Sequence, residues 1–171
     1  RLDTIRPSPA ARETAQKMGA KAELLQLAME EADEVIQQTP WVLLTRKNGI
    51  YSANAGVDTS NMPPGHAILW PKAPFASAQA IRKQLQEEYS LHKLAVIITD
   101  STCVPGRKGT TAIAIGYAGI MGYSDLKGQK DLFGNILRYS ALNIVDSLST
   151  AANLIMGESS ESCPMAIVRE Y

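Results

Sequence analysis

The 171 residues include 17 basic and 17 acidic side chains, and 45% of the residues are hydrophobic. This length and composition suffice for one globular domain with a hydrophobic core. The balanced charge provides no overall field that would attract nucleic acid or an anionic membrane, so we predict neither as a partner. The two cysteines, Cys103 and Cys163, show no CxxC spacing, which favours thiols in a reducing, cytoplasmic protein.

Helix and hairpin signals fill the first third of the chain. Ser8 and the proline after it suit the start of a helix that Gly19 ends. Residues 21–38 repeat apolar side chains at helical spacing and predict a second helix, which Pro40 ends. Residues 41–55 predict a β-hairpin, because two β-rich runs flank an Asn-Gly pair.

The rest of the chain predicts a mixture of strands and helices. In chain order, we expect a strand at 66–70, an amphipathic helix at 75–89, a buried strand at 94–100, a loop at 101–111, a strand rich in small residues at 111–120, a polar loop at 123–135, a long helix at 136–156 that Gly157 stops, and a final strand at 164–170. The predicted fold class is therefore mixed α/β, of the α+β kind, with no Walker P-loop. We expect a single domain over residues 1–171.

Three acidic residues are predicted to lie at the ends of these elements. Asp58 lies in the stretch SANAGVDTSN after one strand, Asp100 ends another strand, and Glu158 follows the glycine that stops the last helix. Carboxylates and hydroxyls are the ligands that Mg²⁺ and Mn²⁺ prefer. The simpler interpretation is that the two aspartates form Asx turns and that the glutamate is solvated.

The segment MGESSES, residues 156–162, is a candidate phosphate-binding loop. Backbone N–H groups near a glycine and several serine hydroxyls bind phosphate in many proteins. Most segments of this composition are ordinary surface loops, however.

Taken in chain order, five segments resemble a known family. They are SANAGVDTSN, AVIITDS, GRKGTTAIAIGYAGI, YSDLKGQKDLFGN and LIMGESSESCPMAIVR. They are similar to segments of the coenzyme F420 γ-glutamyl ligases, and the resemblance covers nearly the whole chain. It implies a cytoplasmic, intertwined homodimer of mixed α/β fold. It also implies an enzyme that uses GTP and two divalent metal ions, Mg²⁺ or Mn²⁺, to join L-glutamate to a carboxylate substrate through an acyl phosphate.

The resemblance also implies roles for individual residues. Asp58 and Asp100 would be catalytic ligands of one metal ion, and Ser101 and Glu158 would help to hold the second. Independently of the resemblance, Arg107 and Lys108 in the loop beyond Asp100 are basic residues that suit phosphate or a substrate carboxylate, and a solvated basic loop is an equal alternative. The residues expected to contact GTP are Asn61, Met156, Gly157, Glu158, Ser159, Ser160, Glu161, Ser162 and Cys163.

Two departures from the family pattern affect these expectations. The family loop resembles DTFGRPWRRGQ, whereas this chain has DSTCVPGRKGTT, without the Phe, Trp and Gln. Recognition of the acceptor therefore cannot be carried over. The family's N-terminal part, with a loop like LPEI and a Ser-Lys pair that contacts GTP, has no counterpart here, and we expect it to precede Arg1.

Three hypotheses follow from the sequence. The first is a GTP- and metal-dependent amide ligase that resembles the family. The second is a nucleotide- or metal-binding protein of the same fold without ligase activity. The third is a structural or subunit-interaction domain, in which the three acids only form turns.

Overall fold

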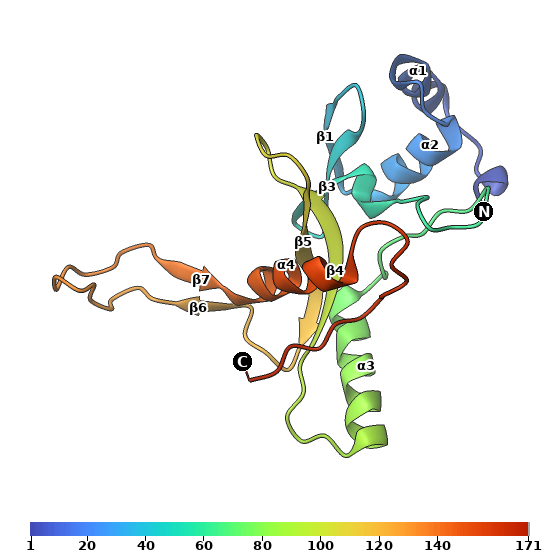
Figure 1. Cartoon of the computed structure of the whole chain (residues 1–171). Helices are drawn as coiled ribbons and strands as arrows, with labels where there is room; N and C mark the ends of the chain where they lie inside the picture. Colours follow the sequence, from blue (N-terminus) through green and yellow to red (C-terminus); the bar gives the residue numbers. More distant parts are fainter. Residues whose placement is uncertain (171) are drawn as a thin grey trace. The chain divides into compact units, whose positions relative to one another are not determined.

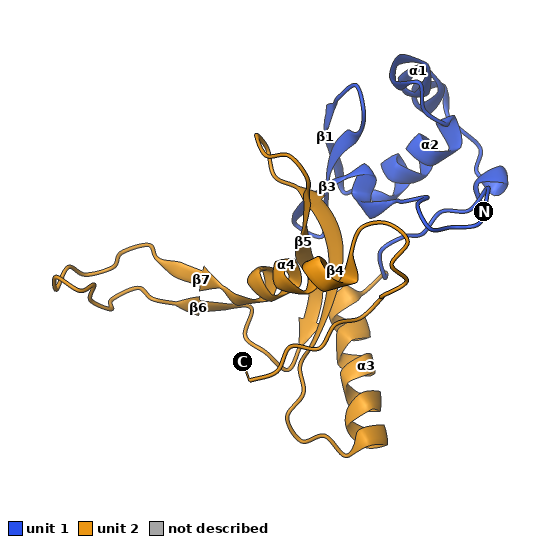
Figure 2. Cartoon of the chain, in the orientation of Figure 1, with its two compact units in different colours: residues 1–71 blue, residues 72–171 orange. Residues whose placement is uncertain are grey.

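The computed structural model describes residues 1–170, which fall into two compact units (Figure 2). Unit 1 ends at Pro71, and unit 2 begins at Lys72. The division reflects contacts within each unit, and the single ligase domain over residues 1–171 stays a prediction.

Unit 1 combines short helices with a three-stranded antiparallel sheet in the order β1-β2-β3 (Figure 1). Its elements are the 3-10 turn η1 (Leu2–Thr4), helices α1 (Pro9–Met18) and α2 (Ala22–Glu31), strands β1 (Glu34–Gln38), β2 (Leu43–Lys47) and β3 (Ile50–Ala53), and the turn η2 (Asn54–Gly56). Its core is one apolar cluster, formed by Ala15, Leu25, Ala28, Leu43 and Val57.

The predicted helix start and hairpin of unit 1 are confirmed. Ser8 Oγ accepts a hydrogen bond from Ala11 N–H at 3.2 Å, and Gly19 ends α1 in the left-handed conformation with φ of 64°. Asn48 and Gly49 join β2 to β3 with φ of 52° and 78°. Two successive positive φ angles suit the twist of a two-residue hairpin, which explains the Asn-Gly signal.

The helix predicted over residues 21–38 is wrong in its second half. The helix ends at Glu31, and residues Glu34–Gln38 form β1. Asp33 N–H donates to Arg46 O at 2.8 Å, and Arg46 forms an ion pair with Glu34, so this segment pairs with β2. All five residues of β1 are exposed. The pairing, rather than an apolar face, therefore decides its conformation.

Unit 2 contains two antiparallel strand pairs and two helices (Figure 1). Its elements are α3 (Pro74–Tyr89), β4 (Val96–Cys103), β5 (Thr110–Ala118), β6 (Tyr123–Asp125), β7 (Ala141–Asn143) and α4 (Ile144–Met156). Both helices pack against β5. Strands β6 and β7 form the base of a long arm, residues 121–143, that projects from the rest of unit 2.

Small residues in β5 allow the close packing that the sequence predicted. A Cβ atom added to Gly116 would lie 2.5 Å from the carbonyl carbon of Pro74, the first residue of α3. Only glycine at position 116 therefore permits the backbone of α3 to approach β5 this closely.

The strand containing Asp100 differs from the prediction. It continues through Asp100 to Cys103, so Asp100 lies within β4 and not at its end. The predicted loop shrinks to residues 104–109, because Ser101 and its neighbours pair with β5. The residues from Val96 to Asp100 are half-buried rather than buried. Because β4 and β5 form a two-stranded sheet, β4 has a neighbouring strand on one edge only, and its side chains are less buried than in the middle of a larger sheet.

The predicted helix at 136–156 begins only at Ile144. Asn143 is its N-cap, accepting from Asp146 N–H at 3.1 Å, and the preceding residues return along the arm as β7. The polar loop predicted at 123–135 likewise opens with β6. Gly157 ends the helix, as predicted.

Two predicted strands are absent from residues 1–170. Residues 66–70 contribute only an isolated bridge between Asp58 and Ile68. Residues 164–170 form no strand, and Met165 and Ile167 remain 79% and 78% exposed. A strand needs a neighbour for its backbone hydrogen bonds. Neither segment has such a neighbour over more than one bridge in the described part of the chain.

The predicted α+β fold class is confirmed, since helices and small antiparallel sheets share both units. None of the helices within residues 1–170 is both long and apolar enough to cross a membrane. Cys103 and Cys163 are free thiols. The cytoplasmic location stays a prediction.

Candidate active site

A left-handed turn precedes Asp58 in unit 1. Asn54, Ala55 and Gly56 have φ of 51°, 54° and 71°, so three successive residues lie in the left-handed region. For residues other than glycine, such a conformation costs about 1–3 kcal/mol and persists only where surrounding contacts impose it.

Four contacts impose this turn. Asn54 Oδ1 accepts from Leu43 N–H at 2.9 Å, and the buried Thr45 Oγ1 accepts from Ala55 N–H at 2.8 Å. Val57 N–H donates to Asn54 O at 2.9 Å. Trp70 closes the fourth side, because a Cβ atom on Gly56 would lie 2.0 Å from the indole nitrogen.

The Asp58 carboxylate ends the turn as a hydrogen-bond acceptor. It accepts from Thr59 N–H at 2.6 Å, from Ser60 N–H at 2.9 Å and from the Ser60 hydroxyl. Partial burial acts to raise the pKa of Asp58, but these hydrogen bonds outweigh it and lower the pKa below its usual value. Asp58 is therefore an anion at neutral pH. This Asx-like arrangement is the simpler role that the sequence left open.

Asp100 and Ser101 are neighbours on β4 in unit 2. Their pairing with β5 is regular, with Asp100 opposite Ile113 and Ser101 opposite Ala112, and the only register shift lies earlier in the strand. Successive side chains of a strand point to opposite faces, so these two residues project to different sides. This arrangement suits the expectation that they serve different ions.

The structure brings Ser101 and Glu158 together. Ser101 Oγ donates to the two carboxylate oxygens of Glu158 at 2.9 and 3.1 Å, across 57 residues of sequence. Asn153 Nδ2, from the last turns of α4, donates to the same carboxylate at 2.8 Å. Hydroxyl, amide and carboxylate thus form one exposed polar cluster at the end of α4.

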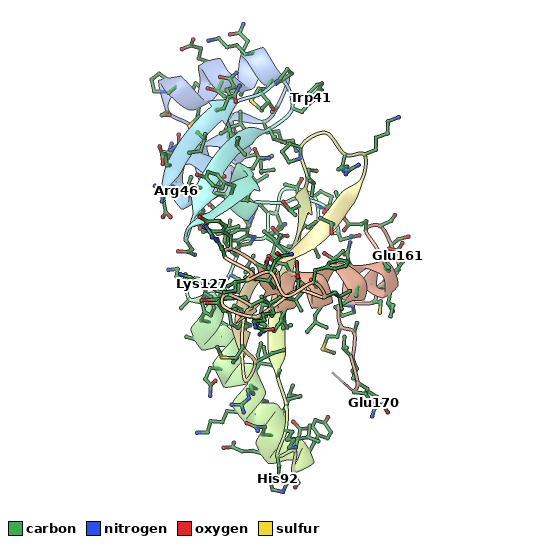
Figure 3. The ribbon with its side chains drawn as sticks, turned by 90° about the vertical axis from the view of Figure 1, so that its left-hand side faces the viewer. Trp41, Arg46, His92, Lys127, Glu161 and Glu170 are labelled. Atoms are coloured by element: carbon green, nitrogen blue, oxygen red, sulfur yellow. The ribbon has the colours of Figure 1, made fainter. Side chains whose placement is uncertain are left out.

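The segment 156–163 folds into a turn stabilised by its own acid. Gly157 has φ of 77°, and Glu161 packs against it so closely that a Cβ atom there would lie 2.3 Å from the Glu161 carboxyl carbon. Ser159 N–H donates to Glu161 Oε2 at 2.8 Å. Glu161 lies beyond the end of α4 (Figure 3). A backbone N–H expected to face phosphate therefore faces a carboxylate.

The other predicted ligands are exposed, with two exceptions. Asn61 has φ of 52° and lies in unit 1, three residues after Asp58. Arg107 and Lys108 occupy the exposed β4–β5 connection, where Arg107 N–H donates to Val104 O at 3.0 Å. Met156 and Cys163 are half-buried.

The donor atoms suit a hard divalent cation, but the cluster is incomplete. Carboxylate, hydroxyl and amide oxygens are the ligands of Mg²⁺ and Mn²⁺. No three His, Cys, Asp or Glu side chains within residues 1–170 gather closely enough to hold a metal. Such ions commonly take the remaining ligands from water and phosphate. Asp58 belongs to unit 1, and Asp100, Ser101 and Glu158 belong to unit 2.

Three residues of these clusters had no predicted role. Asn54 lies inside the stretch SANAGVDTSN, so its place in a turn could have been inferred from its position beside a glycine. Thr45 and Asn153 carry no local signal, because their partners, Ala55 and Glu158, are set by the hairpin register and the end of α4.

Comparison with known proteins identifies the chain. A family model described as F420-0:Gamma-glutamyl ligase matches residues 1–170. Among curated relatives, the "Coenzyme F420:L-glutamate ligase" of Methanococcus maripaludis is 42% identical over 168 residues, which cover 98% of this chain and 67% of the relative. The proteins of the same name from Methanocaldococcus jannaschii and Archaeoglobus fulgidus are 42% and 36% identical, over 67% and 68% of their lengths.

The fold and these matches first define a class, since the chain is a ligase-type α+β protein with no helix long enough to span a membrane in the described part. The chain belongs to the F420-0:γ-glutamyl ligase family. It spans about two thirds of the length of the curated relatives that it matches.

Proposed function

We propose that this protein is a GTP- and metal-dependent ligase that joins L-glutamate by an amide bond to a carboxylate acceptor. Family membership supports ligation with glutamate. The use of GTP, of two Mg²⁺ or Mn²⁺ ions and of an acyl phosphate is part of the proposal, as is the identity of the acceptor.

The chemistry of amide formation supports an activated acid. A free carboxylate does not react with an amine in water, so the acceptor oxygen first takes the γ-phosphoryl group and GDP leaves. The glutamate amine then attacks the acyl carbon, the C–O bond to phosphate breaks, inorganic phosphate leaves and the amine loses a proton. Bound divalent cations would supply charge neutralisation for the phosphates.

The residues of this chain would bind and orient the reactants. Asp58 and Asp100 would hold one cation and Ser101 and Glu158 the second, while Arg107 and Lys108 would face phosphate or the acceptor carboxylate. Asn61 and residues 156–163 would contact GTP. The single observation that supports this assignment is the Ser101–Glu158 hydrogen bond, which brings a hydroxyl and a carboxylate together beside a glycine-containing turn.

Calorimetric titration tests the assignment. GTP is titrated into the chain, together with whatever residues precede it in the cell, with and without Mn²⁺, and GDP release is then measured with glutamate and a deazaflavin acceptor. We expect metal-dependent binding and turnover, and Asp58→Asn or Asp100→Asn should abolish turnover. Asp3→Asn is the matched control, because Asp3 is an exposed partner of Arg1. Full activity in both site variants would contradict the assignment.

A second candidate is a nucleotide- or metal-binding protein of the same fold without ligase activity. It is favoured by the β4–β5 connection, which lacks the aromatic and amide side chains of the family loop. Saturable GTP binding without GDP release over a panel of carboxylate acceptors would select this candidate, and turnover would exclude it.

We further propose a homodimer, supported by the arm. Leu132, Phe133 and Tyr139, which all belong to the arm, are 99%, 91% and 94% exposed. A projecting arm with this much exposed apolar surface is unfavourable in water unless another chain covers it. A second copy is the partner that family membership favours.

Sedimentation measures the oligomeric state directly. The double variant Leu132→Ser and Phe133→Ser should shift the protein toward the monomer. The control is Tyr89→Ser, which removes an aromatic side chain that is 62% exposed on α3, outside the arm. A monomeric wild-type protein, or an unchanged dimer in the double variant, would contradict this proposal.

A further inference from the structure

Thr45 connects the sheet of unit 1 to the turn that precedes Asp58. It lies in the middle of β2 and is completely buried. Its hydroxyl donates to Ser52 O at 2.8 Å, which occupies its only proton, and accepts from Ala55 N–H at 2.8 Å. One side chain therefore fixes the end of β3 and the centre of the turn.

The residue at the centre of the turn, Ala55, does not itself favour this conformation. Ala55 is an alanine at φ of 54°, where the side chain itself disfavours the left-handed region. Its N–H points into the protein interior and has the Thr45 hydroxyl as its acceptor. Without that acceptor, a buried N–H would be left unsatisfied, and the extended conformation would become competitive.

The opposite side of the turn is closed by a second fixed group. Trp70 is 6% exposed and lies against Gly56. The Lys47 ammonium lies 5.7 Å from the Trp70 ring centre and forms an ion pair with Glu31 at 2.5 Å. Lys47 is itself buried, and burial of its ammonium group carries a desolvation cost. The ion pair with Glu31 and the Trp70 ring offset this cost, so the contacts are part of the folded core and not a chance surface arrangement.

The turn fixes the position of the residues that follow it, Val57 and Asp58. Val57, which follows the turn, is held in the core, and Asp58 forms a bridge with Ile68 through backbone hydrogen bonds of 3.2 and 2.8 Å. The direction in which the Asp58 side chain leaves the backbone is therefore set by the turn on one side and by this bridge on the other. Strained backbone that is held so firmly is typical of functional sites.

We infer that Thr45 is a positioning residue for Asp58: its hydroxyl holds the left-handed turn Asn54–Gly56 and thereby aims the Asp58 carboxylate at a divalent cation. The inference rests on the proposed function, in which Asp58 is a metal ligand. Under this inference, a buried residue of β2 that does not itself contact the ion determines how Asp58 is oriented.

The test compares two substitutions of nearly the same size. Thr45→Val keeps the shape of the side chain but removes the hydroxyl, whereas Thr45→Ser keeps the hydroxyl. We expect Thr45→Val to raise the Mn²⁺ concentration for half-maximal GTP binding by about tenfold, a typical effect of losing support behind a metal ligand. Thr45→Ser should keep the Mn²⁺ concentration for half-maximal GTP binding at the wild-type value. Hydrogen exchange of the peptide spanning residues 50–60 should be faster in Thr45→Val only.

A control separates positioning from general destabilisation. Ala11→Gly removes a fully buried methyl group from α1, which packs on α2, and should lower the melting temperature of the protein. It should leave the Mn²⁺ dependence unchanged. Equal Mn²⁺ dependence in Thr45→Val and wild type, or the same weakening in Ala11→Gly and Thr45→Val, would overturn the inference alone. A wild-type protein that binds neither Mn²⁺ nor GTP would overturn the proposed function with it.

Discussion

The Ser101 hydroxyl lies 2.9 and 3.1 Å from the two carboxylate oxygens of Glu158, although 57 residues separate the two in sequence. The contact joins the middle of β4 to the end of α4. Because Ser101 and Glu158 are both exposed, the pair does not stabilise a core. A hydroxyl beside a carboxylate at the surface is instead the pair of oxygen groups that the proposed metal site requires.

Glu158→Gln is expected to weaken metal binding with little effect on folding. The substitution keeps the size of the side chain and an acceptor for Ser101 but removes the negative charge. The Mn²⁺ concentration for half-maximal activity should rise by about tenfold or more. Metal titrations of GDP release measure the change.

Glu87→Gln is the matched control for this prediction. Glu87 lies on the exposed side of α3 in the same unit, and its ion pair with Lys83, at 3.8 Å, is solvent-exposed and worth little. An unchanged Mn²⁺ dependence in Glu158→Gln would remove Glu158 from the set of ligands.

The Asp58 carboxyl predicts a defined pH dependence of stability. Its pKa in the folded state is lowered by the Ser60 and Thr59 hydrogen bonds, which outweigh partial burial. A lowered pKa stabilises the folded state fully above the unfolded value of about 3.9, and this contribution is lost as the pH falls through the folded value. The wild-type protein should therefore be more stable than Asp58→Asn at about pH 6, and this advantage should shrink progressively as the pH falls below the unfolded value of about 3.9.

Urea unfolding in a chelator, in steps of pH downward from about pH 6, measures this difference without bound metal. Ser60→Ala removes one of the donors and should reduce the difference without abolishing it. A constant difference across the whole pH range would show that the charge of Asp58 does not contribute.

The close approach of α3 to β5 predicts that Gly116→Ala is destabilising. The new methyl carbon would lie 2.5 Å from the Pro74 carbonyl carbon, and backbone cannot move aside as a side chain can. Overpacking of this kind costs about 1–3 kcal/mol. Gly122→Ala is the comparison, because its nearest contact is the hydroxyl end of the Tyr117 side chain. Urea unfolding should show the larger loss for Gly116→Ala, and equal losses would contradict the backbone explanation.

Local signals predicted those parts of the fold that local chemistry decides. The N-cap at Ser8, the hairpin at Asn48 and Gly49, and the helix stop at Gly157 all depend on residues next to one another in sequence. Each of these predictions is confirmed. The stretch around Asp58 was recognised for the same reason, because its small and polar residues are contiguous.

Long-range pairing decided the parts that were missed. Residues 34–38 continue the helical pattern of apolar residues, but their backbone hydrogen-bonds to β2, so they form a strand instead. The predicted helix at 136–156 likewise includes the residues of β7, although their backbone pairs with β6. Contacts such as Ser101 with Glu158 depend on which strand face meets which helix end. Periodicity along one segment contains no information about that.

The N-terminus of α4 is the last feature that makes a quantitative prediction. Asp146 Oδ1 accepts from Ala114 N–H of β5 at 2.8 Å, while its Oδ2 accepts from Asn143 Nδ2 at 2.5 Å. One carboxylate thus holds the side chain of the N-cap residue Asn143 and attaches the first turn of α4 to β5, just beyond the register shift between β4 and β5. Removing it leaves the half-buried Ala114 N–H without its acceptor. Asp146→Ala should therefore cost about 1–3 kcal/mol in the free energy of unfolding.

Ser147→Ala is the control for Asp146→Ala, because Ser147 Oγ donates only to Asn143 O on the exposed side of the same turn. It should cost less than about 1 kcal/mol. Because Asp146 holds α4 against β5, and Glu158 follows directly after the glycine that ends α4, Asp146→Ala should also raise the Mn²⁺ requirement of the proposed ligase, whereas Ser147→Ala should not. Denaturant unfolding and metal titration of the two variants measure both effects. Equal effects of the two substitutions would show that the position of α4 does not depend on the Asp146 carboxylate.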